Sequence, residues 1–181
     1  KMAKAHLTLF AVLVTGLVLV EPVSAVPLTS VLEDPEGDAL GFPNPQLPGD
    51  PIMDVIRAEI SLKDGRFELR LRVADTIPAS PELPPGIHLR QWGWGLDTNP
   101  ATFPAGFPWV PGIPDANEYD VEILWDGTRF FAQLVDRTPL LTGGEAIVTP
   151  LSFRVKGAEF QTSVDAATIG GPSTIVWGSG A

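Results

Sequence analysis

The chain has 181 residues and carries 22 Asp and Glu against 12 Lys and Arg, which gives a formal net charge of −10. So acidic a balance argues against nucleic acids and anionic membranes as partners, because both are themselves negatively charged. The chain contains no cysteine, so no disulfide can stabilise the fold.

The first 25 residues have the pattern of a secretory signal peptide. A basic start with Lys1 and Lys4 precedes the unbroken apolar run 7–20, and small residues at 23–25 provide a cleavage site. The apolar run is too short for a membrane span of about 20 residues. We therefore expect residues 1–25 to be removed. The mature chain would then act outside the cell, at the cell surface or in a periplasm, without inserting into a membrane.

The segment 55–73 (VIRAEISLKDGRFELRLRV) gives the clearest structural signal. Apolar side chains alternate with polar ones in both halves of the segment, which is typical of half-buried strands. Asp64 and Gly65 lie between the two halves, and Asp-Gly favours a tight hairpin turn because glycine accepts a positive φ. The segment therefore predicts two antiparallel strands joined by that turn.

The rest of the chain contains short strands separated by turn signals and no amphipathic helix. Alternation predicts strands at 88–97, 118–125, 129–136, 145–149, 151–155, 158–164 and 173–177, with a helical turn at 165–169. Residues rich in Pro and Gly predict loops at 26–51, 76–85 and 99–115. This pattern predicts one all-β domain over residues 26–181, an antiparallel β-sandwich of jelly-roll type. Because the chain stops soon after the last predicted strand begins, we expect the domain to continue beyond Ala181.

The loop that precedes the hairpin carries three alternating carboxylates, Asp34, Glu36 and Asp38. Calcium takes six to eight oxygen ligands, and clustered carboxylates with loop carbonyls commonly supply them. The sequence therefore predicts a structural calcium held by these three residues. The alternative is a solvated turn in which Asp38 accepts hydrogen bonds from its own backbone.

Three tryptophans, Trp92, Trp94 and Trp109, lie on or beside one strand and the loop that follows it. A flat aromatic face can bind a sugar by stacking, and glycines alternating with the first two leave the other face of the strand open to close approach. We predict that the three bind carbohydrate. The alternative is that one or two of them fill the core, as we expect of Trp125 and Trp177.

Glu118, Asp120 and Glu122 lie on one face of the strand 118–125. Retaining glycosidases use a pair of carboxylates, one as nucleophile and one as acid/base. The E-x-D-x-E pattern of this strand resembles the catalytic strand of family 16 glycoside hydrolases, which are secreted β-jelly rolls. The alternative is a solvent-facing strand whose charges oppose pairing with other chains.

A series of short motifs along residues 31–178 resembles the family 9 carbohydrate-binding-module and DOMON-like superfamily of secreted bacterial β-sandwich domains. The motifs are DPEGD at 34–38, MDVI at 53–56, GLDTN at 95–99, EYDV at 118–121 and WDG at 125–127. The resemblance implies a module that binds sugars or acts without catalysis, often with a structural calcium in the loop of Asp34, Glu36 and Asp38. Some DOMON relatives bind haem, for which Met53 and His88 would be the candidates.

Taken together, the sequence predicts a secreted, non-catalytic carbohydrate-binding or cell-surface accessory module whose partner is a polysaccharide or glycan. Two alternatives stay open. One is a β-glucan hydrolase that uses Glu118 and Glu122 with Asp120 between them. The other is a structural or adhesion domain without a small ligand. Metalloprotease, P-loop and dinucleotide-binding motifs are absent from the sequence.

Overall fold

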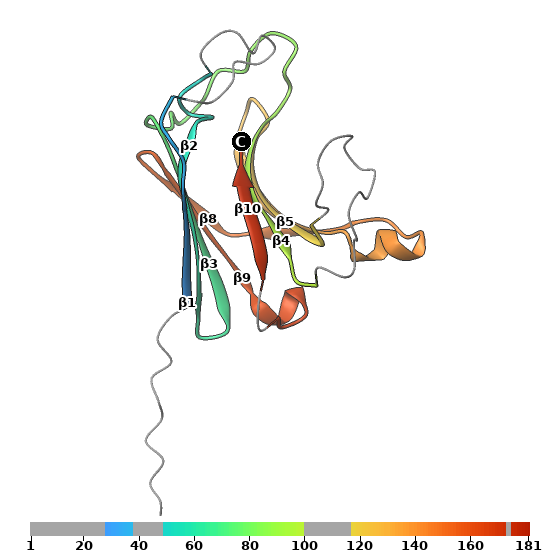
Figure 1. Ribbon diagram of the computed structural model, residues 1–181. Helices are drawn as coiled ribbons and strands as arrows, with labels where there is room; N and C mark the ends of the chain where they lie inside the picture. Colours follow the sequence, from blue (N-terminus) through green and yellow to red (C-terminus); the bar gives the residue numbers. More distant parts are fainter. Residues whose placement is uncertain (1–27, 38–48, 100–116, 173–174) are drawn as a thin grey trace, which may run out of the picture.

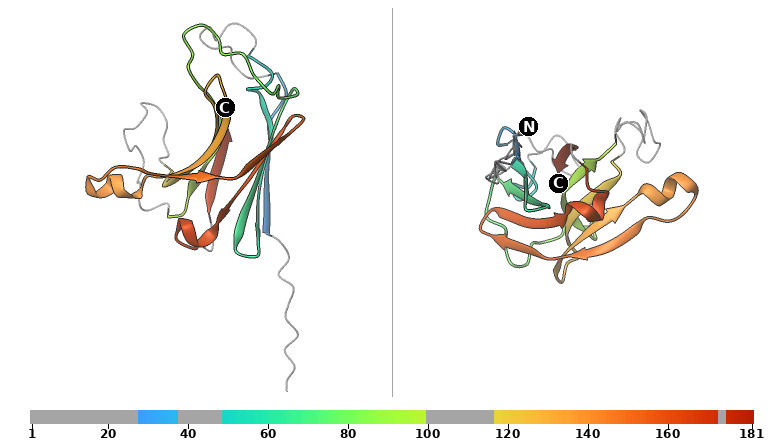
Figure 2. Two further views of the ribbon diagram at one scale, coloured as in Figure 1. Left: turned by 180° about the vertical axis from the view of Figure 1, so that it is seen from behind. Right: turned by 90° about the horizontal axis from the view of Figure 1, so that it is seen from below.

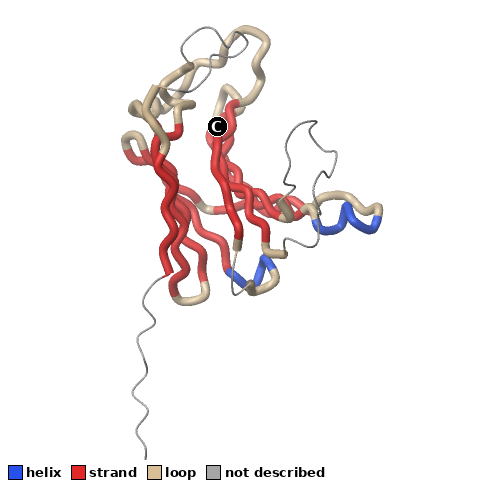
Figure 3. The backbone as a smooth tube through the Cα atoms, in the orientation of Figure 1, coloured by secondary structure: helices blue, strands red, loops and turns tan. Residues whose placement is uncertain are grey.

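The computed structural model describes residues 28–37, 49–99, 117–172 and 175–181. Within these ranges the chain is built almost wholly of β-strands, and the only helical pieces are two short 3-10 turns (Figure 3). None of the described helical pieces has the length or the apolar character needed to span a membrane. The predicted signal peptide lies outside the described residues.

Two five-stranded antiparallel sheets face each other (Figures 1 and 2). The first sheet has the order β1-β2-β3-β9-β8, with the bounds β1 Leu28–Glu33, β2 Val55–Lys63, β3 Arg66–Val73, β9 Glu159–Asp165 and β8 Phe153–Lys156. The second sheet has the order β10-β4-β5-β6-β7, with the bounds β10 Val176–Gly180, β4 Arg90–Asp97, β5 Tyr119–Trp125, β6 Phe130–Asp136 and β7 Ile147–Leu151. The 3-10 turns are η1 Thr138–Thr142 and η2 Ala166–Ile169.

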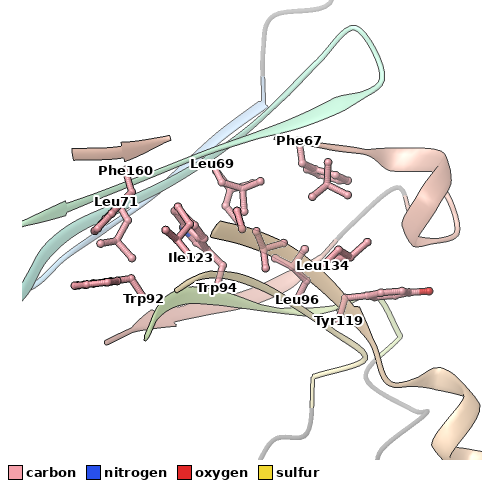
Figure 4. Close-up of a cluster of buried hydrophobic side chains, with 14 of the residues drawn as sticks. Phe67, Leu69, Leu71, Trp92, Trp94, Leu96, Tyr119, Ile123, Leu134 and Phe160 are labelled. Atoms are coloured by element: carbon pink, nitrogen blue, oxygen red, sulfur yellow. The ribbon is translucent and has the colours of Figure 1, made fainter. Parts of the chain in front are cut away.

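The hydrophobic core fills the space between the two sheets (Figure 4). Alternate residues of each strand point inward, since side chains of a strand alternate between its two faces. Trp92 of β4 packs against Phe160 of β9 with ring centroids 4.8 Å apart, so aromatic contacts join the second sheet to the first. The Trp92 indole N–H also donates to the Ile52 carbonyl oxygen at 2.6 Å, which fastens the residues before β2 to β4.

The sandwich and the first hairpin confirm the predictions. Asp64 and Gly65 form the β2–β3 turn with φ of 50° and 76°, as a tight hairpin requires. The helical turn expected at 165–169 is η2, and Trp125 lies in the core as predicted. Trp177 packs against the core from the edge strand β10 and is half-buried.

The prediction of a loop throughout 26–51 is wrong for residues 28–33, which form β1. This strand lies at the edge of the first sheet and pairs only with β2. Both Val31 and Leu32 are exposed, at 38% and 44%, although they point to opposite faces. A strand that buries neither face has no periodic hydrophobic pattern, so alternation could not reveal it.

Candidate ligand-binding face

The structure places Trp92 and Trp94 in the hydrophobic core, with 0% and 1% of their surface exposed. A sugar must reach the face of an indole ring to stack on it, and here both faces are covered by protein. The prediction that these two residues bind carbohydrate is therefore wrong. Leu96 is on the same face of β4 and is fully buried, which shows that this side of the strand serves the core. Trp109, the third predicted sugar contact, lies outside the described residues.

The glycines that alternate with the tryptophans allow close approach by protein groups. A Cβ at Gly93 would lie 2.6 Å from the carbonyl oxygen of Val121 on β5, so any side chain there would displace the neighbouring strand. At Gly95 a Cβ would overlap the side-chain amide of Asn117. The close approach predicted at this face therefore does occur, and it is made by the backbone of β5 and by Asn117.

Glu118 fastens the end of β4 to the start of β5. Its carboxylate is buried and accepts hydrogen bonds from the backbone N–H of Thr98 at 2.8 Å and of Asn99 at 3.0 Å. The hydroxyl group of Thr98 donates to the same oxygen. A carboxylate with three donors on one oxygen holds this turn in place, so Glu118 has a structural role.

Asp120 lies on the outer side of β5 and is largely buried. It forms an ion pair with Arg137, which follows β6. Burial disfavours the charged form and is the main reason why the pKa of Asp120 is raised to about 6. Arg137 and the Asn117 amide lower that pKa, whereas the nearby Glu122 carboxylate raises it. Asp120 therefore changes its charge near pH 6, well above the usual range of an aspartate.

Glu122 lies two residues further along the same face and joins two neighbouring strands. Gln91 of β4 donates from Nε2 to one carboxylate oxygen at 3.1 Å. Gln133 of β6 donates from Nε2 to the other oxygen at 2.7 Å. The three side chains form a hydrogen-bonded row across β4, β5 and β6, which we call the amide–carboxylate band.

The amide–carboxylate band and the neighbouring Asp120–Arg137 pair belong to one surface. We call this outer surface of the second sheet the acidic face, and it comprises Gln91, Asp120, Glu122, Gln133 and Arg137. Sequence reasoning identified only the two carboxylates of this set. Gln91 and Gln133 come next to them through the pairing of β4, β5 and β6, and Arg137 directly follows β6 and reaches Asp120 by its ion pair.

The predicted calcium loop is described only in part. Asp34 and Glu36 are exposed in the segment after β1, and Asp38 lies outside the described residues. The backbone N–H of Gly37 donates at 2.7 Å to a carboxylate oxygen of Asp54, which is buried just before β2. A further carboxylate thus lies against the loop. Within the described part of the chain, no group of three or more potential metal ligands is found.

The two residues considered for haem are in different surroundings. Met53 packs against the hydrophobic core, and His88 is exposed on the connection before β4. Neither residue contributes to the acidic face.

Comparison of the chain with protein-family models, with curated proteins and with solved structures finds no match. The resemblance to the family 9 carbohydrate-binding modules and DOMON-like domains therefore stays a prediction.

Proposed function

We propose that the protein is a secreted, non-catalytic carbohydrate-binding module whose ligand-binding surface is the acidic face. The observation that carries this proposal is the amide–carboxylate band, in which Gln91 and Gln133 hold both oxygens of Glu122. Planar amides and carboxylates arranged side by side can donate and accept hydrogen bonds with adjacent hydroxyl groups of a sugar. The ligand class is therefore a polysaccharide rich in free hydroxyl groups.

Two further features of the acidic face support this role. The band is built on three paired strands, so its side chains are held on a rigid surface that changes little on binding. Gln91 is exposed and Glu122 is half-buried, so a ligand can reach the band from solvent. Gly93 is paired with Glu122 across β4 and β5 and adds no side chain beside it.

The test mixes the purified chain with a panel of insoluble neutral polysaccharides and measures protein lost from the supernatant together with reducing ends released. We expect depletion of protein without release of reducing ends. Glu122→Ala should weaken the binding about tenfold, which corresponds to the loss of one good charged hydrogen-bonding group. Thermal unfolding of the variant would show that it is folded.

Glu145→Ala is the matched control, because Glu145 is an exposed glutamate between η1 and β7, outside the acidic face. It removes the same charge and should leave binding unchanged. Equal losses in the two variants would mean that net charge, rather than the band, determines binding. Absence of any binding would favour the structural or adhesion domain.

A hydrolase is the second candidate function, and the raised pKa of Asp120 favours it. A carboxyl group whose pKa is raised can act as a general acid, and Glu122 lies on the same strand face as the second carboxylate. Glu118, predicted from the sequence as one of the two catalytic carboxylates, is less suited to that role, because the turn after β4 already uses its carboxylate.

Release of reducing ends would support the hydrolase and contradict the non-catalytic module. In that case Asp120→Asn should abolish release while protein depletion persists. If Asp120→Asn leaves the rate of release unchanged, the activity does not come from this face.

A structural calcium at Asp34, Glu36 and Asp38 belongs to the same proposal. The hydrogen bond from Gly37 to Asp54 supports it, since it brings a buried carboxylate against the loop and shapes its backbone. Carboxylate oxygens are the ligands that calcium prefers in proteins. The ion would order the connection between β1 and β2.

A further inference from the structure

The outer surface of the first sheet has a charge opposite to that of the whole protein. We call it the basic face, and it carries seven of the twelve Lys and Arg of the chain, namely Arg57, Lys63, Arg66, Arg70, Arg72, Arg154 and Lys156. The acidic residues on the same surface are Glu33, Glu59, Glu68, Glu159 and Asp165. Basic residues therefore exceed acidic ones here, although the chain as a whole has a charge of −10.

The remaining basic residues of the described chain have other positions. Arg90 is buried and forms an ion pair with Asp50 at 2.7 Å. Arg137 is paired with Asp120 on the acidic face. Arg129 lies in the turn between β5 and β6. The positive charge of the mature chain is thus concentrated on one surface.

Most basic residues of this face form no ion pair with the described residues. Arg57 pairs with Glu33 and Glu59, and Arg66 pairs with Asp165. By contrast, no ion pair among the described residues involves any of the other five, which are all exposed, namely Lys63, Arg70, Arg72, Arg154 and Lys156. Exposed like charges that repel one another and have no partner favour the approach of an anion.

Strand pairing brings two of these arginines to either side of an amide. Gln161 of β9 is in register with Arg70 of β3 and with Arg154 of β8. The three residues line an open hollow of about 410 Å³ together with Ser152 and Ser163. Two arginines thus lie on either side of Gln161, whose Nε2 donates a hydrogen bond to Glu159, in one depression of the sheet.

This combination matches a sugar that carries a carboxylate. A guanidinium group binds a carboxylate with two parallel hydrogen bonds, while amide and hydroxyl groups suit the hydroxyl groups of the ring. Glu68 lines the same hollow, and Glu159 is in register with Arg72. These carboxylates can accept hydrogen bonds from sugar hydroxyls.

We propose that the basic face binds an acidic polysaccharide, one whose sugar units carry carboxylates, with Arg70 and Arg154 as the carboxylate-binding residues. This surface belongs to the sheet opposite the acidic face. The proposal is therefore independent of the proposed function of that face, and either can fail alone.

The test measures binding of the purified chain to immobilised polygalacturonate, with carboxyl-reduced polygalacturonate as the matched neutral ligand. We expect binding to polygalacturonate that weakens as salt is added, and little binding to the reduced polymer. Arg70→Gln and Arg154→Gln should each weaken binding about tenfold, because each removes a charge-assisted pair of hydrogen bonds. Arg129→Gln is the matched control, since Arg129 is equally an exposed arginine but lies away from this face.

The outcomes separate the proposal from its competitors. Equal binding to the two polymers, or equal losses in the three arginine variants, would overturn it, because carboxylates or these particular arginines would then have no special role. Loss of polygalacturonate binding in Glu122→Ala would assign the ligand to the acidic face and also overturn it. Tighter binding to duplex DNA or to anionic phospholipid vesicles, with the same dependence on Arg70 and Arg154, would replace the polysaccharide by that partner.

Discussion

The two sheets of the sandwich are built alike but present opposite charges to solvent. Each has five antiparallel strands, and each contributes alternate side chains to one shared core. Among the outward-facing charged residues of the first sheet, arginines and lysines outnumber carboxylates, whereas the second sheet presents carboxylates and amides on β4, β5 and β6. The inner faces therefore determine stability, and the outer faces are free to differ in charge.

The largest expected effect comes from the shared core and should affect both faces together. Trp92→Ala removes a fully buried indole that contacts Phe160 and donates to Ile52, so it should lower the free energy of unfolding by about 3–5 kcal/mol. Urea unfolding followed by tryptophan fluorescence measures this change. Trp177→Ala is the control. Trp177 is only half-buried on an edge strand, so its replacement should lower the free energy of unfolding by less. A Trp92→Ala variant of normal stability that had lost only sugar binding would restore the original stacking prediction.

The second-largest effect is a dependence of stability on pH, and it should arise on the acidic face. The pKa of Asp120 is raised from 3.8 to about 6, so the folded state holds a proton there that the unfolded chain releases near pH 4. This contribution to stability is complete below about pH 4 and is lost as pH rises through 6. The loss is on the order of 3 kcal/mol. We expect stability to fall more steeply from pH 4.5 to 7.5 in the native chain than in Asp120→Asn. Parallel pH profiles would show that Asp120 titrates normally.

Chelation should act on the edge of the first sheet alone. If calcium orders the connection between β1 and β2, excess EDTA should lower the melting temperature. An ion present at a hundredfold its dissociation constant stabilises the folded state by about 2.7 kcal/mol. Adding calcium back, but not sodium, should restore the original melting temperature. An unchanged melting temperature in EDTA would mean that no calcium stabilises the protein. That result would leave the proposed binding at the acidic face unaffected.

The smallest effect concerns the ion pairs of the basic face. Asp165→Asn breaks the exposed contact with Arg66, in which the charged atoms lie 3.3 Å apart, and should change stability by less than about 1 kcal/mol. The same variant frees one arginine, so binding of polygalacturonate should become slightly tighter. Equilibrium unfolding and the binding assay measure the two quantities. A large loss of stability would show that the pair is structural.

Local patterns in the sequence were sufficient for the strands and hairpin turns of the fold after β1. Phe67, Leu69 and Leu71 alternate with charged residues, and Asp64-Gly65 marks the turn before them. The strand order could not be read in this way, because β3 pairs with β9 from the other end of the chain. The edge strand β1 was missed for a different reason, since it buries neither of its faces.

The candidate sites depended on information that a single strand does not contain. Alternation placed Trp92 and Trp94 on one face of β4 but did not say whether that face was inside, although Leu96 on the same face was a usable signal. Glu122 was found from its strand, whereas Gln133 joined it only through the register of β5 and β6. The basic residues of the basic face lie on β2, β3 and β8. Its positive charge therefore depends on the pairing of strands, which no single segment of the sequence indicates.

The pairing of β3 with β9 also has a consequence for how the protein folds. A hydrogen bond between Arg66 and Ser163 joins positions 97 residues apart. In the β2–β3 hairpin and the run β4-β5-β6-β7, by contrast, each strand pairs with the strand that follows it in the chain. Contacts distant in sequence form slowly because a long loop must close before they contribute. We expect the hairpin and the β4–β7 meander to form early. Docking of β8 and β9 onto β3 would then be the slow step that closes the sandwich.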